Sequence, residues 1–233
     1  MTRPSHFILG CILMVTSLFT SASAQTLSIP TSVRNLNEDL VAEFRPSELG
    51  KADRSILQIT IGVHTLADVL RILGPSQVMR SSEGCSEVCY ISSIPGDGTR
   101  LIFSFDPLEG SRREGSRRAI YFQVLDDSTA VDLPCAHSRR VSKVIGTPSG
   151  LRLGASIKSL HFRLGRPTST EEQAFTLSFR AEQRMAPEQI IRSRNLHGES
   201  VMEHPFFEWL SGVRVTYHDH QITSFEVYRY LSR

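Results

Sequence analysis

Residues 57–75 read LQITIGVHTLADVLRILGP, and residues 151–167 read LRLGASIKSLHFRLGRP. Both stretches pass from alternating apolar residues to a glycine, then through a helical pattern to Leu-Gly and a proline. Gly62 corresponds to Gly154 and Pro75 to Pro167, and each pair is separated by 92 residues. Self-similarity at a fixed separation indicates an internal repeat, so the sequence predicts two related units in tandem.

The first part of each repeat is typical of a short strand that ends in a sharp turn. Leu57, Ile59 and Ile61 alternate with polar residues, as Leu151 and Leu153 do in the second copy. This alternation predicts a strand with one buried face. The glycine that follows allows a backbone turn in which a side chain would clash.

The second part of each repeat predicts a helix. Thr65 and Asp68 have the spacing of a capping box, and Ser156 caps the second helix less completely. Apolar residues at helical spacing then supply an inward face. They are Val69, Leu70 and Leu73 in the first copy, and Leu160 and Leu164 in the second. Leu-Gly with a following proline ends each helix.

Strand pairs follow both helices. Alternating apolar residues predict strands at 101–105 and 120–124, and at 213–217 and 225–227 with a turn at 218–220. Further strands are expected near 76–81, 88–93 and 174–180, and a short amphipathic helix near 35–45. The predicted fold is α+β, with two tandem units, each a helical segment packed on an antiparallel β-sheet. The units are 56–130 and 148–233, preceded by an N-terminal segment at 25–55.

This pattern of strand, glycine, helix, Leu-Gly and proline followed by hairpins resembles the SmpA/OmlA family, which includes an outer-membrane assembly lipoprotein. It is also similar to the tandem fold of the β-lactamase inhibitory proteins. The resemblance covers roughly 57–125 and 150–230. It implies a two-unit architecture and a role in binding other proteins, without transferring any individual binding residue.

Residues 1–24 are typical of a secretory signal peptide. A short segment with Arg3 precedes an apolar run from Phe7 to Phe19, and small residues at 21–24 predict cleavage before Gln25. That run is shorter than the roughly 20 residues that span a bilayer, and no later stretch reaches this length. We therefore expect a periplasmic or secreted protein. Ile8–Cys11 also resembles a lipobox, and the sequence leaves lipidation of Cys11 open.

The charge of the mature chain is nearly balanced. Signal removal leaves 25 basic and 24 acidic side chains, which gives no reason to expect nucleic acid as a partner. Arginines cluster at Arg112, Arg113, Arg117 and Arg118, and further basic residues at Arg139, Arg140 and Lys143. These clusters are either solvated loop charge or a patch for an acidic protein, lipid or polysaccharide.

Three cysteines remain after signal removal: Cys85, Cys89 and Cys135. An oxidising compartment favours a structural disulfide among them, and the spacing leaves the pairing open. A redox site is the weaker interpretation, because Cys85 and Cys89 lack the usual C-x2-C spacing. One cysteine is left over unless it bonds to another chain.

The aromatic cluster Phe206-Phe207-Glu208-Trp209-Leu210 contains the only tryptophan. Aromatic residues of this kind dominate binding hot spots, so Phe206, Phe207 and Trp209 are the first interface candidates, and Arg112 and Arg113 the second. Packing in the core is the competing interpretation of the cluster.

The sequence shows no zinc-binding, nucleophile-elbow, Walker or dinucleotide motif, so we predict no catalytic site, metal or cofactor. The favoured function is non-catalytic protein binding in the bacterial envelope, as an assembly accessory or an inhibitor. The alternatives are a binding protein for an apolar or cell-wall-derived small ligand, and a cryptic hydrolase.

Overall fold

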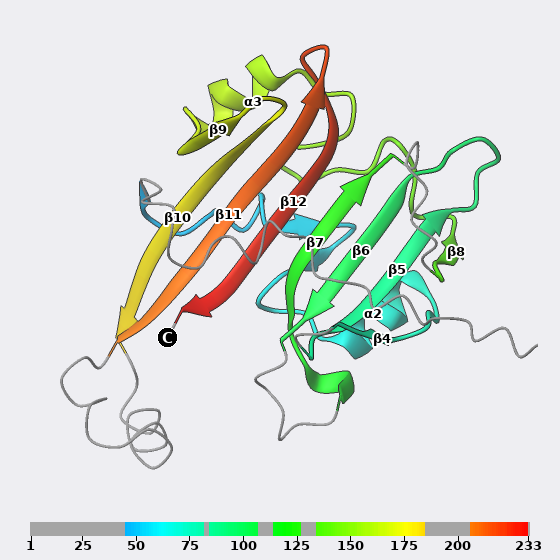
Figure 1. Ribbon diagram of the computed structural model, residues 1–233. Helices are drawn as coiled ribbons and strands as arrows, with labels where there is room; N and C mark the ends of the chain where they lie inside the picture. The colour runs from blue at the N-terminus through cyan, green and yellow to red at the C-terminus, as the bar shows by residue number, and fades with distance from the viewer. Residues whose placement is uncertain (1–44, 82–83, 107–113, 127–133, 185–205, 233) are drawn as a thin grey trace, which may run out of the picture.

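A computed structural model describes residues 45–81, 84–106, 114–126, 134–184 and 206–232 (Figure 1). In these ranges the chain forms two α-helices, one short 3-10 helix and twelve β-strands. The elements are β1 (Arg45–Pro46), β2 (Ser55–Ile56), β3 (Ile59–Thr60), α2 (Leu66–Leu73), β4 (Met79–Arg80), β5 (Ser86–Ser92), β6 (Arg100–Phe105), η1 (Glu114–Ser116), β7 (Ala119–Leu125), β8 (Ala136–Ser138), α3 (Ile157–Leu164), β9 (Ser169–Glu171), β10 (Ala174–Arg184), β11 (Phe206–His218) and β12 (Gln221–Ser232).

Ten strands join in one sheet, in which β1, β10, β11, β12, β7, β6, β5 and β4 are successive neighbours. At one end, β1 and β9 share the outer edge of β10, and at the other, β4 and β8 lie against β5. Only the short pairings of β1 with β10 and of β8 with β5 are parallel. The predicted helices on an antiparallel sheet are confirmed, although the structure is mostly β.

The sequence suggested a sheet in each half, whereas the structure has one continuous sheet. The two halves meet where Ser224–Tyr228 of β12 pairs with Tyr121–Leu125 of β7. Each is the last strand of its half, and an unpaired strand edge leaves a row of backbone N–H and C=O groups without ladder partners. Pairing β12 with β7 satisfies both edges at once.

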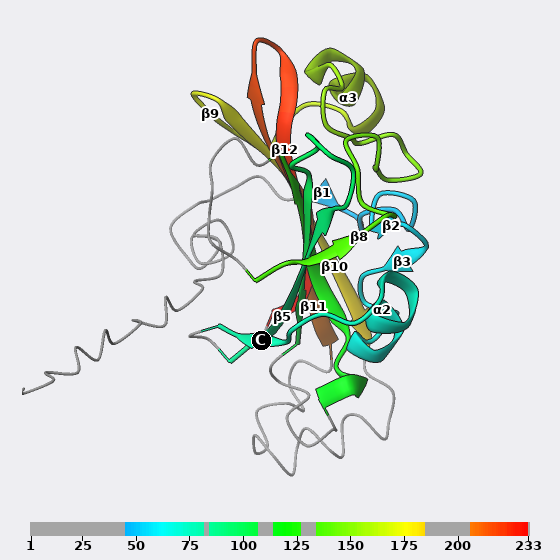
Figure 2. The ribbon, with the colours of Figure 1, turned by 90° about the vertical axis from the view of Figure 1, so that its right-hand side faces the viewer.

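Both helices lie on the same side of the sheet (Figure 2). Alternate residues of each strand point toward them and form the core. The buried residues of this face include Val88, Tyr90, Leu101, Phe103, Phe105, Phe122, Val124, Phe175, Leu177, Val213, Val215, Phe225 and Val227. From the helix side, α2 contributes Leu66, Val69 and Leu73, and α3 contributes Leu160. The predicted inward positions are therefore confirmed, with Leu70 and Leu164 only partly buried.

The predicted capping box at the start of α2 is present. Asp68 N–H donates to Thr65 Oγ1 at 3.3 Å, and Thr65 N–H donates to Asp68 Oδ2 at 3.0 Å. At α3, Ser156 Oγ accepts one hydrogen bond, from Lys158 N–H at 3.3 Å. The less complete cap predicted for the second helix is thus confirmed. The turns predicted at Gly62 and Gly154 are also present, with φ of +78° and +69°.

The predicted strands at the start of both repeats are wrong in part. Leu57 and Gln58 have φ of +48° and +69° and form the two-residue turn between β2 and β3. Positive φ at both central positions is the geometry of a tight hairpin turn whose twist matches that of the strands. In the second half, Arg152 makes only an isolated bridge to Gly146. Alternation of apolar residues therefore reports burial at these two places and not a continuous strand.

The described part of the N-terminal segment packs on the second half of the chain. Leu49 is 2% exposed, and its N–H donates to Ser211 Oγ of β11 at 3.1 Å. Glu48 accepts a hydrogen bond from Arg229 Nε of β12 at 2.6 Å. Residues 45–55 therefore join the two halves. The helix predicted near 35–45 lies outside the described residues, apart from Arg45 in β1.

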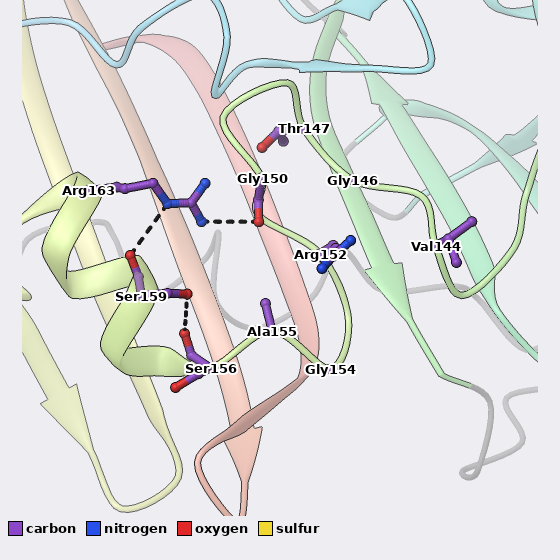
Figure 3. Close-up of a pocket in the computed structure, with 10 residues that line it drawn as sticks. All are labelled: Val144, Gly146, Thr147, Gly150, Arg152, Gly154, Ala155, Ser156, Ser159 and Arg163. Atoms are coloured by element: carbon purple, nitrogen blue, oxygen red, sulfur yellow. Dashed lines mark hydrogen bonds between the residues drawn. The ribbon is translucent and has the colours of Figure 1, made fainter.

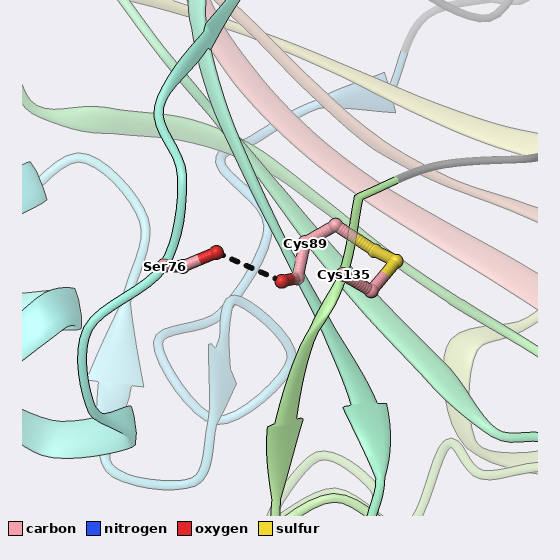
Figure 4. The surroundings of a disulfide bond; sticks show 3 residues. All are labelled: Ser76, Cys89 and Cys135. Atoms are coloured by element: carbon pink, nitrogen blue, oxygen red, sulfur yellow. Dashed lines mark hydrogen bonds between the residues drawn. A yellow bond between two sulfur atoms is a disulfide. The ribbon is translucent and has the colours of Figure 1, made fainter.

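A disulfide joins Cys89 of β5 to Cys135, which precedes β8 (Figure 4). The Ser76 hydroxyl donates to the carbonyl oxygen of Cys89 at 3.0 Å. The parallel pairing of Tyr90 with Ala136 places the two cysteines next to each other on neighbouring strands. Cys85 is buried and is not part of a disulfide. The predicted disulfide is confirmed, and its pairing is now assigned.

The disulfide closes a loop between residues that are 46 positions apart, so its removal should destabilise the protein. We expect Cys135→Ala to lower the free energy of unfolding by about 2–4 kcal/mol, mainly through a less restricted unfolded chain. Cys85→Ala is the matched control and should cost on the order of 1 kcal/mol. The measurement is denaturant unfolding of the oxidised protein. Identical unfolding midpoints for the oxidised and reduced protein would contradict this expectation.

Candidate functional site

A pocket lies between α3 and the loop that leads into it (Figure 3). Its volume is about 560 Å³. It is lined by Val144, Gly146, Thr147, Gly150, Arg152, Gly154, Ala155, Ser156, Ser159 and Arg163. Two guanidinium groups, three hydroxyl groups and exposed backbone make this lining polar. The pocket therefore suits a polar ligand better than an apolar one.

Thr147 fixes the loop that forms one wall of the pocket. Its N–H donates to the Leu151 carbonyl oxygen at 2.9 Å, and its Oγ1 accepts from Leu151 N–H at 3.1 Å. Gly150 N–H in turn donates to the Thr147 carbonyl oxygen at 2.7 Å. The Thr147 side chain is buried, as is that of Leu151. These bonds hold the loop in a defined shape in place of regular secondary structure.

Arg163 lies across this wall against Gly150. Its Nη2 donates to the Gly150 carbonyl oxygen at 3.1 Å and its Nε to the Ser159 carbonyl oxygen at 3.4 Å. Gly150 has φ of +88°, and a Cβ atom there would collide with the Arg163 guanidinium. Glycine is therefore required for this contact. Both acceptors are neutral carbonyls, so the charge of Arg163 is oriented by them without being neutralised.

Arg152 adds a second positive charge to the pocket. Its side chain is exposed, and among the described residues no hydrogen bond or ion pair engages its guanidinium. The surrounding sequence contains no Asp or Glu between Asp132 and Glu171. That span carries Arg139, Arg140, Lys143, Arg152, Lys158, Arg163 and Arg166. None of the residues that line the pocket is acidic, and the carboxylates of Asp97 and Asp126 contact the neighbouring Lys143 from outside this span.

Phe162 stands on the outer side of α3 and is 92% exposed. Lys158 lies one turn earlier, so these two side chains share one stripe of the helix surface. Ser159 and Arg163 form the neighbouring stripe, which lines the pocket, because successive helical residues are about 100° apart. An exposed aromatic ring thus adjoins a basic pocket. We call this surface, formed by the pocket with Lys158 and Phe162, the α3 surface.

The corresponding surface of α2 differs in its chemistry. The two helices have eight residues each and both end at a glycine that donates its N–H to the fourth preceding carbonyl. In this register Phe162 corresponds to Arg71 and Lys158 to Ala67. Arg71 is also exposed, and it pairs with Asp68 at 3.3 Å. The exposed aromatic residue is therefore specific to α3.

The opposite face of the sheet carries a row of polar side chains. Cross-strand pairing places them in one line from β5 to β10, in which Gly212 separates the last two: Glu87, Ser104, Tyr121, Tyr228 and Ser178. Tyr228 and Ser178 share a hydrogen bond of 3.1 Å, and Ser104 donates to Glu87 at 3.0 Å. Burial raises the pKa of Tyr121 well above its usual value, and the carboxylates of Glu226 and Glu87 raise it further. Among the described residues the Tyr121 hydroxyl has no hydrogen-bond partner.

Trp209, the only tryptophan, lies half-buried on the helix side of β11. Arg229 stacks on its ring, with Cζ 3.8 Å from the ring centroid. The same guanidinium binds Glu48, which also pairs with Arg54 at 3.4 Å. A cation over a tryptophan face is stabilising. Trp209 therefore helps to attach residues 45–55 to the sheet, and its role in binding a partner stays a prediction.

The other predicted interface residues are only partly described. Phe206 and Phe207 begin β11 and pair with the end of β10, but their side chains are not among those the structure describes. Arg112 and Arg113 lie outside the described residues. The role of these residues in an interface therefore stays a prediction.

The His218–His220 turn is present as predicted, with Asp219 and His220 at positive φ between β11 and β12. In the described ranges no group of three or more His, Cys, Asp or Glu side chains is placed to hold a metal ion. No helix in the same ranges is long and apolar enough to cross a membrane.

Comparison with known proteins gives no match to a family model, to a curated protein sequence or to a solved structure. The α3 surface therefore has to be interpreted from its own chemistry. In the sequence, the α3 surface is marked by the span from 133 to 170, which contains no Asp or Glu. Within that span, only Arg139, Arg140 and Lys143 were identified from the sequence as a basic cluster. The exposure of Phe162 does have a signal, because the predicted inward positions Leu160 and Leu164 leave residue 162 on the outer side of the helix.

The two buried tyrosines of the polar row give a matched test of the sheet. Tyr121→Phe removes a hydroxyl that has no partner among the described residues, so the free energy of unfolding should stay the same or rise by about 1 kcal/mol. Tyr228→Phe leaves the buried Ser178 hydroxyl unpaired and should lower it by about 1–2 kcal/mol. Denaturant unfolding of both variants distinguishes them. Equal destabilisation by the two changes would mean that the Tyr121 hydroxyl has a partner in solution.

Proposed function

We propose that the mature chain is an exported, non-catalytic protein-binding module of the bacterial envelope, acting as an assembly accessory or an inhibitor. Its binding site is the α3 surface. The observation that carries this proposal is Phe162, which is 92% exposed beside two arginines and a lysine. An aromatic anchor with neighbouring arginines has the composition of a binding hot spot.

The recurrence of one local architecture supports the tandem interpretation of the fold. In each half, three backbone hydrogen bonds join the residues before or at the start of the helix to the start of the last strand. They connect 62–119, 64–119 and 66–117 in the first half, and 154–222, 155–222 and 157–220 in the second, at 2.6–3.1 Å. Two copies of one unit account for this repetition. The resemblance to SmpA/OmlA proteins and to β-lactamase inhibitory proteins is part of the same proposal.

Export is supported by the signal-like sequence at residues 1–24 and by the Cys89–Cys135 disulfide. Disulfides form and persist mainly in oxidising compartments outside the cytoplasm. The Gln25–Arg233 chain in the periplasm, or secreted beyond it, is therefore the form of the protein to be tested.

The second candidate function is binding of a small anionic molecule, such as a carboxylated fragment of the cell wall. The observation that favours it is the pocket itself, because a volume of about 560 Å³ lies within the range of small-molecule sites. Its polar lining argues against an apolar ligand. Protein binding is preferred because Phe162 stands outside the pocket, where a small ligand held inside it would not cover the ring.

Site-specific crosslinking tests the proposed function. A photoreactive phenylalanine analogue at position 162 should crosslink one envelope protein, whereas the same analogue at position 71 should not. The purified partner should then bind the mature protein, and Phe162→Ala should weaken that binding about tenfold. Since Phe162 is exposed, the variant should unfold within about 0.5 kcal/mol of the original protein. Equal crosslinking from both positions, or full binding by Phe162→Ala, would refute the proposal.

A further inference from the structure

We infer that the pocket between α3 and its preceding loop is a carboxylate-binding subsite that receives an acidic side chain from a partner polypeptide. This inference rests on the proposed function and adds the chemistry by which the partner is recognised. The site is built by Arg163, Arg152 and Gly150, and its neighbour on the helix surface is Phe162.

The positive charge of Arg163 has a fixed orientation at the pocket. The Arg163 guanidinium is held against the pocket wall by two backbone carbonyls, which fix its plane without cancelling its charge. Guanidinium groups bind carboxylates through paired N–H donors, and an oriented one loses less freedom when it binds. Arg152 lines the same pocket with an exposed guanidinium. Two positive charges at one concave site favour an anionic group.

The two glycines that precede the helices, Gly62 and Gly154, have different surroundings. Next to Gly62, the position of an added Cβ would lie 2.7 Å from Arg229 Nη1, and Arg229 is paired with Glu48. At Gly62 this space is thus occupied by an arginine of β12, whose charge is already paired with Glu48. At Gly154, nothing lies within 4 Å of the corresponding position. The second half leaves that space open and supplies arginines without an acid.

The α3 surface extends beyond the guanidinium groups of the pocket. A free anion would use only the guanidinium groups, whereas Lys158 and Phe162 extend the site along the next stripe of α3. A segment that carries a carboxylate and an apolar side chain uses both parts. The occupant that fits this surface is therefore an acidic peptide segment with an apolar residue close to its Asp or Glu.

The test uses the purified mature protein and a fluorescent synthetic peptide of alternating glutamate and leucine. The peptide should bind, and a peptide with glutamine in place of glutamate should not. Arg152→Glu should weaken binding about tenfold or more. Arg71→Glu makes the same charge change on the exposed face of α2 and should have little effect. Raising the salt concentration should weaken binding, because the contact is between exposed charges.

Three results would overturn the inference. The first is equal affinity of the Arg152→Glu variant and the original protein for the glutamate peptide. The second is displacement of the peptide by inorganic phosphate at lower concentration than by free glutamate, which would indicate a phosphate site. The third is binding of phosphatidylglycerol vesicles, in place of the peptide, with the same dependence on Arg152.

The two proposals fail separately. If the position-162 crosslink and the effect of Phe162→Ala persist but Arg152→Glu binds the peptide normally, only the carboxylate subsite is wrong. If crosslinking does not depend on position 162 while the peptide still requires Arg152, the pocket is an acid-binding site and the protein-binding role of the α3 surface is wrong.

Discussion

The antiparallel pairing of β7 with β12 determines the architecture of this protein. Five residues from each strand are in register, and Phe122 and Phe225 meet edge to face across the junction with ring centroids 6.4 Å apart. This pairing converts two meanders into one sheet and places both helices on the same side. It also merges the apolar layers under α2 and α3 into one core, which contains buried residues of both halves. Because the core is shared, neither half can lose its packing without exposing apolar surface of the other.

Much of the local structure could be predicted from the sequence, because strong local signals determine it. Thr65 and Asp68 indicate the start of α2, and the alternation around Phe103, Phe122 and Phe225 indicates strands at these places, although β12 extends well beyond the predicted 225–227. The strand prediction was wrong where an alternating apolar pattern has another cause, namely burial of a turn by distant parts of the chain. Leu57 is apolar in an alternating stretch, yet it occupies a hairpin turn. The continuous sheet was also not predictable, because the sequence of a strand does not determine which other strand pairs with its edge.

The candidate site was beyond sequence analysis for a different reason. Trp209 and the arginine-rich loops stood out by composition, whereas the α3 surface depends on three-dimensional placement. Arg163 looks like an ordinary helical arginine until the Gly150 carbonyl is seen to orient it. Phe162 has the composition of a core residue, but its helical position, two residues from the inward Leu160, leaves the ring exposed. Residue type indicates what a side chain can do, and packing decides whether it is available to do it.

Both outer edges of the sheet are divided between two short strands, β1 and β9 on β10, and β4 and β8 on β5. Each of these strands is only two or three residues long. In the described ranges these short strands interrupt both edges, which disfavours edge-to-edge pairing with another chain and therefore lateral aggregation.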